Sequence, residues 1–313
     1  MRLIRRLAWF AGSLLLASLL IFGATNLLPG DIANVLLGTN ATPEAVDALR
    51  EELGLNRPFF VRYVEWLGGV LVGDFGTSMI SGRSVTATVL PALGVSGWLV
   101  GLATVGSLVI ALPVGAFAAV RRRHVDGITV SALSQIGLAV PAFWAGIWLV
   151  VLFAVQLRWL PAGGYVPITQ SFGQWAAHLA LPVAALSIVQ ASVMSRYVRS
   201  AVIEVLHTDY FRTARAVGWG KLGALWRHGM RNISISLLTV IGLQIATLLV
   251  GAIIIEQVFA LPGLGSKLLY AVTQRDLVVV QGIVLLLVWA VLFINFIVDV
   301  TYQAIDPRLK REA

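Results

Sequence analysis

Long runs of apolar residues, separated by short polar segments, dominate the chain. Six of these runs reach the roughly 20 residues that a helix needs to cross the hydrocarbon core of a bilayer. They cover residues 7–28, 95–120, 128–157, 178–200, 234–258 and 281–303. Pro113, Pro141 and Pro182 lie inside three of the runs, where we expect either simple kinks or bent helices that line a pathway. The pattern predicts an all-α polytopic membrane protein with six transmembrane helices.

The polar segments between these runs divide the chain. Residues 1–28 form the first span, which follows a basic start and is too long for a cleaved signal peptide. We expect an insertion at 29–94, a core of five spans at 95–303, and a tail at 304–313. Within the insertion, Thr42 or a neighbour can cap a helix that has Pro43 at its first position and ends at Gly54. Aromatic residues at 59, 60, 63 and 66 then predict an amphipathic helix at the membrane surface.

Composition and charge fit a membrane protein. Of the 313 residues, 58% are hydrophobic and only 12% are charged, whereas soluble domains have about 25% charged residues. The net charge of +8 is explained by basic loops that face the cytoplasm, so we expect no nucleic-acid partner. With the N-terminus inside, the inner segments hold 16 of the 23 Lys and Arg residues, namely Arg2, Arg5, Arg6, Arg121, Arg122, Arg123, Arg196, Arg199, Arg212, Arg215, Lys221, Arg227, Arg231, Arg308, Lys310 and Arg311. This bias predicts an N-in, C-in topology that makes 29–94 an extracytoplasmic helical insertion.

A polar interruption at 204–233 lies between two of the predicted spans, on the inner side. Asp209 or Thr208 can cap a short helix that starts near Tyr210, and Gly218 can end it in a left-handed conformation. Small residues at 213, 214 and 216 permit close docking of another protein, with arginines beside them as anchors. The residues alone also allow a loop that only touches lipid phosphates.

The sequence offers little chemistry of its own. It has no Cys, four scattered His residues and no nucleophile or phosphate-binding motif, so we expect no catalytic, cofactor or metal site and no enzyme. Energy for transport would come from a partner or an ion gradient. Glu256, near the end of a span, could face a cavity or pair with Lys267 or Arg275. Because no acidic relay lies in the middle of a span, a stand-alone secondary transporter or channel is the weaker alternative.

Motifs in a fixed order carry a resemblance to a known family. The segments are LLPGDIA at 27–33, GDFGTS at 73–78, DYFRTARAVG at 209–218, EQVFALPGLG at 256–265 and DPR at 306–308. Together they resemble the membrane-spanning permease subunit of bacterial ABC importers of the dipeptide, oligopeptide and nickel type, over nearly the whole chain. The chain departs from the family pattern at Arg212, where an acidic residue is typical, at Val217 in place of Lys, and at Ser236 in place of Pro.

The resemblance implies an ATP-driven importer in the bacterial plasma (inner) membrane. Its partners would be a second homologous permease subunit, two ATPase subunits that bind ATP and Mg, an extracytoplasmic binding protein and membrane lipid. Peptides are the expected substrate, with nickel complexes, heme or other small solutes left open. The implied docking helix for an ATPase, or coupling helix, comprises Asp209, Tyr210, Arg212, Thr213, Ala214, Arg215, Ala216 and Gly218. The implied contacts for the binding protein and outer gate are Asp74, Gly76, Glu256, Pro262, Gly263, Arg275 and Asp276.

Overall fold

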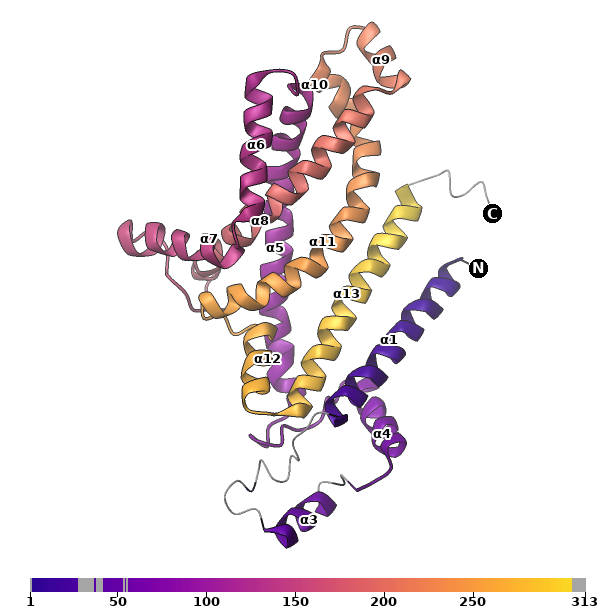
Figure 1. The fold of residues 1–313 in the computed structure, drawn as a ribbon, viewed down its shortest axis with the longest axis vertical. Coiled ribbons are helices and arrows are strands. Elements are labelled where there is room, and N and C mark those ends of the chain that lie inside the picture. Colours follow the sequence, from indigo (N-terminus) through magenta and orange to yellow (C-terminus); the bar gives the residue numbers. More distant parts are fainter. Residues whose placement is uncertain (1, 28–36, 38–41, 53, 55, 306–313) are drawn as a thin grey trace. The chain divides into compact units, whose positions relative to one another are not determined.

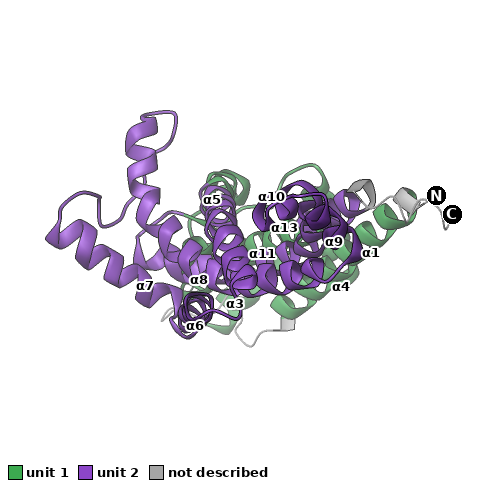
Figure 2. Ribbon diagram, turned by 90° about the horizontal axis from the view of Figure 1, so that it is seen from above, with its two compact units in different colours: residues 1–94, 263–293 green, residues 95–262, 294–313 purple. Residues whose placement is uncertain are grey.

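The computed structural model describes residues 2–27, 37, 42–52, 54 and 56–305, and these residues are mainly helical (Figure 1). Residues 28–33 of the LLPGDIA motif and residues 306–313 of the predicted tail lie outside this set. The chain divides into two compact units (Figure 2). Unit 1 comprises residues 1–94 and 263–293, and unit 2 comprises residues 95–262 and 294–313.

Unit 1 contains the N-terminal helices and most of the last one. Its helices are α1 (Arg2–Leu27), α3 (Pro43–Glu52), α4 (Phe59–Leu71), the first part of α5 (Val85–Val120), α12 (Leu264–Thr273) and most of α13 (Leu277–Ile305). The predicted start and end of α3 are confirmed. The Thr42 hydroxyl accepts a hydrogen bond from the Ala45 N–H at 3.3 Å, and Gly54 has φ +66°.

The aromatic residues of α4 pack on the first span. The rings of Phe59, Tyr63 and Trp66 lie 5.3, 5.6 and 5.4 Å from the ring of Phe22 on α1, measured between centroids. Phe60 is instead 72% exposed. The predicted helix is therefore present, and three of its four aromatic side chains join it to α1.

Unit 2 contains the rest of α5 and the elements up to residue 262. These are α6 (Val125–Ala139), α7 (Ala142–Leu149), the π-helix η2 (Val150–Gln156), α8 (Phe172–Leu206), α9 (Asp209–Ala216), α10 (Lys221–Ala224), the π-helix η3 (Leu225–Gly229) and α11 (Met230–Val258). Helix α8 is the central element, because it packs against α6, α7 and α11. In its most apolar stretch of 18 residues, half of the residues are buried inside the protein.

Small residues let α5 approach α8 closely. The Ser187 hydroxyl on α8 donates a hydrogen bond to the Ala103 carbonyl on α5 at 3.2 Å. A Cβ atom added to Gly115 on α5 would lie 2.6 Å from the Cβ of Val198 and 2.7 Å from the Ser195 carbonyl oxygen. Close approach of backbones through glycine is a common way to join helices inside a membrane.

The run at 128–157, predicted as one span with Pro141 inside it, is sharply bent in the structure. The structure has two helices there, α6 and the continuous α7–η2 segment, at an angle of 98°. Pro141 explains the break, because it has no N–H to donate and disfavours helical geometry in the preceding residue. Val140 accordingly has φ −88° and ψ 116°. Pro182, by contrast, lies within continuous α8.

The other predicted spans correspond to long helices. Within the described residues, five helices are long and apolar enough to cross a membrane, or six if the bent pair counts as one span. Helix α5 begins at Val85, well before the apolar run at 95–120 that predicted it. Residues 85–94, which the sequence placed in the outer insertion, are therefore helical. Ser84 precedes them, and its hydroxyl accepts a hydrogen bond from the Ala87 N–H at 3.4 Å.

Candidate functional site

Helix α9 lies in the loop between α8 and α11, at the end of both helices (Figure 1). Two of its side chains point into the protein: Phe211 is 4% exposed and Ala214 is 8% exposed. They belong to a hydrophobic cluster with Val205 of α8, Leu225 of η3 and Ile233 of α11. One face of this short helix is therefore anchored to the ends of two membrane-spanning helices.

The ends of α9 agree with the sequence prediction except at the N-cap. Thr208 occupies the cap position, but its hydroxyl donates to the Val205 carbonyl at 2.6 Å and accepts nothing from α9. Asp209 lies in the first turn, where its negative charge interacts favourably with the helix dipole. At the other end, Gly218 has φ +101°, which confirms the predicted left-handed residue. The Arg215 guanidinium donates to the Trp219 carbonyl at 2.6 Å and stabilises this turn.

The opposite face of α9 is exposed. Eight residues are predicted to dock an ATPase, and one of them, Ala214, faces the chain's own core. The other seven are exposed, namely Asp209, Tyr210, Arg212, Thr213, Arg215, Ala216 and Gly218. The Tyr210 hydroxyl accepts a hydrogen bond from the Asn232 side-chain amide at 2.8 Å. This bond links the exposed side of α9 to the first turn of α11. Ala214, in contrast, packs against the hydrophobic cluster that α9 shares with α8, η3 and α11.

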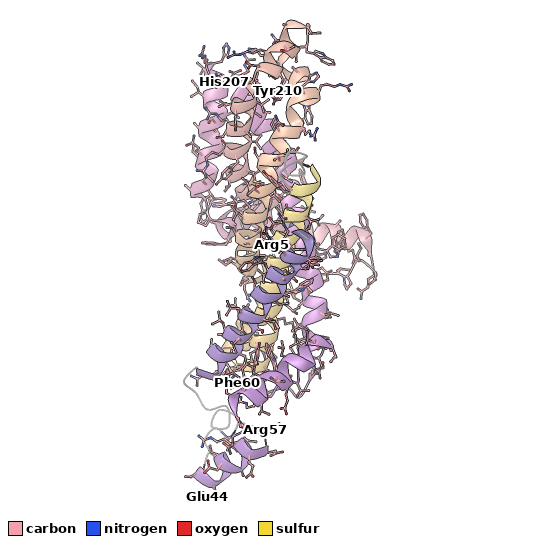
Figure 3. All side chains as sticks on the ribbon, turned by 90° about the vertical axis from the view of Figure 1, so that its right-hand side faces the viewer. Arg5, Glu44, Arg57, Phe60, His207 and Tyr210 are labelled. Carbon is pink, nitrogen blue, oxygen red and sulfur yellow. The ribbon has the colours of Figure 1, made fainter. Side chains whose placement is uncertain are left out.

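A second basic loop lies at the same end of unit 2. The Arg122 guanidinium, in the loop between α5 and α6, donates to Nε2 of His207 at 3.2 Å. Because arginine can only donate, Nε2 accepts, and Nδ1 of His207 donates to the Ile203 carbonyl at 2.7 Å. Figure 3 shows His207 close to Tyr210 at this end. The sequence did not predict this contact, because Arg122 and His207 lie 85 residues apart.

Glu256 and the loop after α11 occupy another part of unit 2. Glu256 is 1% exposed and accepts a hydrogen bond from the Ser96 hydroxyl of α5 at 2.5 Å. The Phe259 carbonyl accepts the Gly164 N–H at 2.8 Å, so the loops at 159–171 and 259–262 are joined. Within this second loop, Pro262 is exposed. Glu256 therefore has a structural partner on α5, which the sequence did not reveal.

The remaining outer candidates shape turns in unit 1. Asp276 is 6% exposed, accepts a hydrogen bond from the Ser78 hydroxyl, and accepts the Val279 N–H in the first turn of α13 at 3.4 Å. Asp74 accepts the Gly76 N–H at 2.9 Å, and Gly76 has φ +88°. Gly263, just before α12, is buried. Two candidates present charge on the surface, Asp74 and Arg275.

Within the described ranges, no group of three His, Asp or Glu side chains lies close enough to hold a metal ion. The most distinctive feature is an anchored helix with an exposed face that carries Arg212 and Arg215. Such a face can bind another protein by shape and charge, and the anchored side can pass a displacement to α8 and α11.

Comparison with known proteins decides the family. Residues 111–311 match the family described as binding-protein-dependent transport system inner membrane component, and residues 1–98 match the N-terminal part of such components. The chain belongs to this family. It is 38% identical over 308 residues to a peptide transport system permease protein of Brucella abortus (strain 2308), covering 98% of each chain. It is 37% identical over 307 residues to the glutathione transport system permease protein GsiC of Salmonella typhi, again covering 98% of each chain.

The fold is also similar to a solved transporter. A chain from the inward-facing MetNI methionine ABC transporter superimposes with a TM-score of 0.59 and 21% identity, covering 70% of this chain and 96% of that chain. This chain is thus the permease of an ABC importer, located in the inner membrane. It works with ATPase subunits, which carry the ATP hydrolysis, and with a substrate-binding protein. The resemblance found in the motifs is confirmed, and the comparisons do not support the alternative of a stand-alone carrier or channel.

Proposed function

We propose that this ABC permease imports peptides and forms half of the translocation pathway with a second homologous permease subunit. Relatives that share 98% of its length are named for peptide and for glutathione transport, which supports a short peptide as substrate. Two ATPase subunits would bind ATP and Mg, and this chain would carry no cofactor. An analysis by mass spectrometry of the ligands retained by the cognate binding protein tests the substrate. Short peptides are expected, whereas a metal complex without peptide would refute the substrate class.

The anchored geometry of α9 carries the proposed coupling mechanism. Its exposed face, with Arg212, Thr213 and Arg215, would bind an ATPase subunit. Its buried face, with Phe211 and Ala214, shares a core with α8 and α11. Closure of the ATPase subunits on ATP would move α9, and the shared core would pass this movement to the two spans. This mechanism places α9 in the cytoplasm, in an N-in, C-in arrangement of six spans that counts α6 with α7–η2 as one.

Other surfaces would receive the remaining partners. On the outer side, the exposed residues Asp74, Pro262 and Arg275 would contact the binding protein. Helix α7 presents an exposed aromatic face, in which Trp144 is 49% and Trp148 is 56% exposed. Tryptophan is enriched in the cores of protein interfaces. This face would therefore pack on the second permease subunit.

The absence of cysteine allows a clean test of ATPase docking. A single cysteine at Ala216 or Val217, both exposed at the C-terminal end of α9, would carry a photoreactive maleimide in the complete complex. Gln170, exposed in the loop before α8, provides the control position. We expect cross-links to an ATPase subunit from positions 216 and 217 and none from 170. Equal cross-linking from all three, or none from α9, would refute the docking assignment.

A further inference from the structure

A cleft of about 800 Å³ lies between the end of α5 and the elbow formed by α10 and η3. All of its lining residues belong to unit 2. The elbow connects α9 to α11, so the cleft adjoins the coupling segment without including α9. Its volume falls within the range of about 300–1,000 Å³ that is typical of small-molecule sites.

The walls of the cleft are apolar and exposed. Phe117 of α5 is 40% exposed, and Leu222 and Trp226 of the elbow are 57% and 63% exposed. Large apolar side chains exposed together mark a surface that another apolar group covers. In a membrane protein, tryptophan near the end of a span is typical of the level of the lipid headgroups. The walls therefore favour a hydrocarbon chain as the occupant.

The lining side chains also carry positive charge. Arg121, which directly follows α5, and Lys221, at the start of α10, both line the cleft. Nε of Arg121 forms an ion pair with Asp126 at 2.7 Å, which offsets part of its charge, whereas Lys221 is exposed. His124 also lines the cleft, and none of its lining residues, all within the described part of the chain, is acidic. The lining therefore favours an anion.

We propose that this cleft binds an anionic phospholipid. Its phosphate would lie at Arg121 and Lys221, and an acyl chain would cover Phe117, Leu222 and Trp226. Basic pockets between membrane helices on the cytoplasmic side bind the headgroups of anionic lipids. Free phosphate has the required charge but would leave the apolar walls exposed, so a lipid fits better. The inference rests on the proposed function only in placing this end at the cytoplasmic leaflet. The bound lipid would bridge α5 and the elbow that leads from α9 to α11.

The direct test uses brominated lipids in nanodiscs that contain the complete transporter complex. Bromine on an acyl chain quenches nearby tryptophan fluorescence, and Trp226 lines the cleft. We compare brominated phosphatidylglycerol with brominated phosphatidylcholine, in the parent complex and in Trp226→Phe. Extra quenching by phosphatidylglycerol in the parent, absent from Trp226→Phe, supports the proposal. Equal quenching by both lipids indicates ordinary annular lipid and overturns it, and so does displacement of phosphatidylglycerol by inorganic phosphate alone.

Two variants test the site through independent properties. Lys221→Gln removes a charge, and Gly220→Trp fills space, since a Cβ added to Gly220 meets no atom within 4 Å. Arg227→Gln is the matched control, because it removes the same charge from an exposed residue outside the cleft. Native mass spectrometry should show about fivefold weaker retention of phosphatidylglycerol in Lys221→Gln, the factor expected for one basic residue. Gly220→Trp should also lose the lipid, and Arg227→Gln should retain it. Equal retention in all three, or retention of a second permease copy at the cleft in place of lipid, overturns the proposal.

Discussion

Phe211 holds α9 in place, so its replacement by alanine should loosen this helix while leaving the spans folded. The side chain is only 4% exposed, and removing a buried phenyl ring costs about 3–5 kcal/mol. A helix as short as α9 is not stable without tertiary packing. The loss therefore falls on the attachment of α9 to the core that it shares with α8 and α11. With a loss of about 3 kcal/mol, amide exchange that requires detachment of α9 should become about a hundredfold faster.

Hydrogen–deuterium exchange of the full chain in nanodiscs measures this effect. We expect faster exchange in Phe211→Ala for peptides covering 209–218, with little change in α8 and α11. Arg212→Ala is the matched control, because the adjacent Arg212 side chain is exposed and forms its ion pair, at 3.5 Å, with Asp209 of the same helix. Unchanged exchange of α9 in Phe211→Ala would refute the anchoring argument. Equal acceleration throughout α8 would show that the variant unfolds globally.

Three further predictions concern packing and buried hydrogen bonds, each measured as thermal stability of the purified protein. Gly115→Ala should destabilise the fold by about 1–3 kcal/mol, because the added methyl lies 2.6 Å from a side-chain carbon on α8. Gly101→Ala, on the same helix with nothing within 4 Å, should be neutral or slightly stabilising, and equal losses in the two would contradict the packing. Ser96→Ala should cost about 1–3 kcal/mol, because buried Glu256 loses a donor; an unchanged melting temperature would show that this bond contributes nothing. Asp276→Ala should cost a similar amount, about 1–3 kcal/mol, through loss of the α13 cap, whereas Asp276→Asn should recover part of it. Equal stability of the alanine and asparagine variants would argue against capping.

The sequence predicted the features that local chemistry decides. Pro43 marks the start of α3, and Gly54 and Gly218 end helices in left-handed conformations, because these preferences act within one or two turns. Apolar length predicted the spanning helices for a similar reason. The start of α5 at Val85 was missed because its first residues are less apolar than the run that follows.

Features that depend on distant packing were not predictable. The helices on either side of Pro141 are bent by 98°, while Pro182 lies within the unbroken helix α8, because neighbouring helices decide whether a proline is accommodated. The burial of Ala214 depends on how α9 meets α8 and α11, so the sequence could only identify it as small. The contact between Ser96 and Glu256 joins positions 160 residues apart, beyond any local pattern.

Binding of an ATPase subunit to the exposed face of α9 is tested most directly by one measurement. Thr213→Trp places a bulky ring on this face, where Thr213 only bonds its own helix, through the Asp209 carbonyl at 3.0 Å. Thr129→Trp is the matched control, since exposed Thr129 makes the same bond within α6, to the Val125 carbonyl at 2.8 Å. The amount of ATPase subunit that co-purifies with the tagged permease should fall about tenfold in Thr213→Trp, as expected for a steric clash of about 1.4 kcal/mol, and stay at the parent level in Thr129→Trp. Equal recovery of the ATPase with both variants would contradict the account.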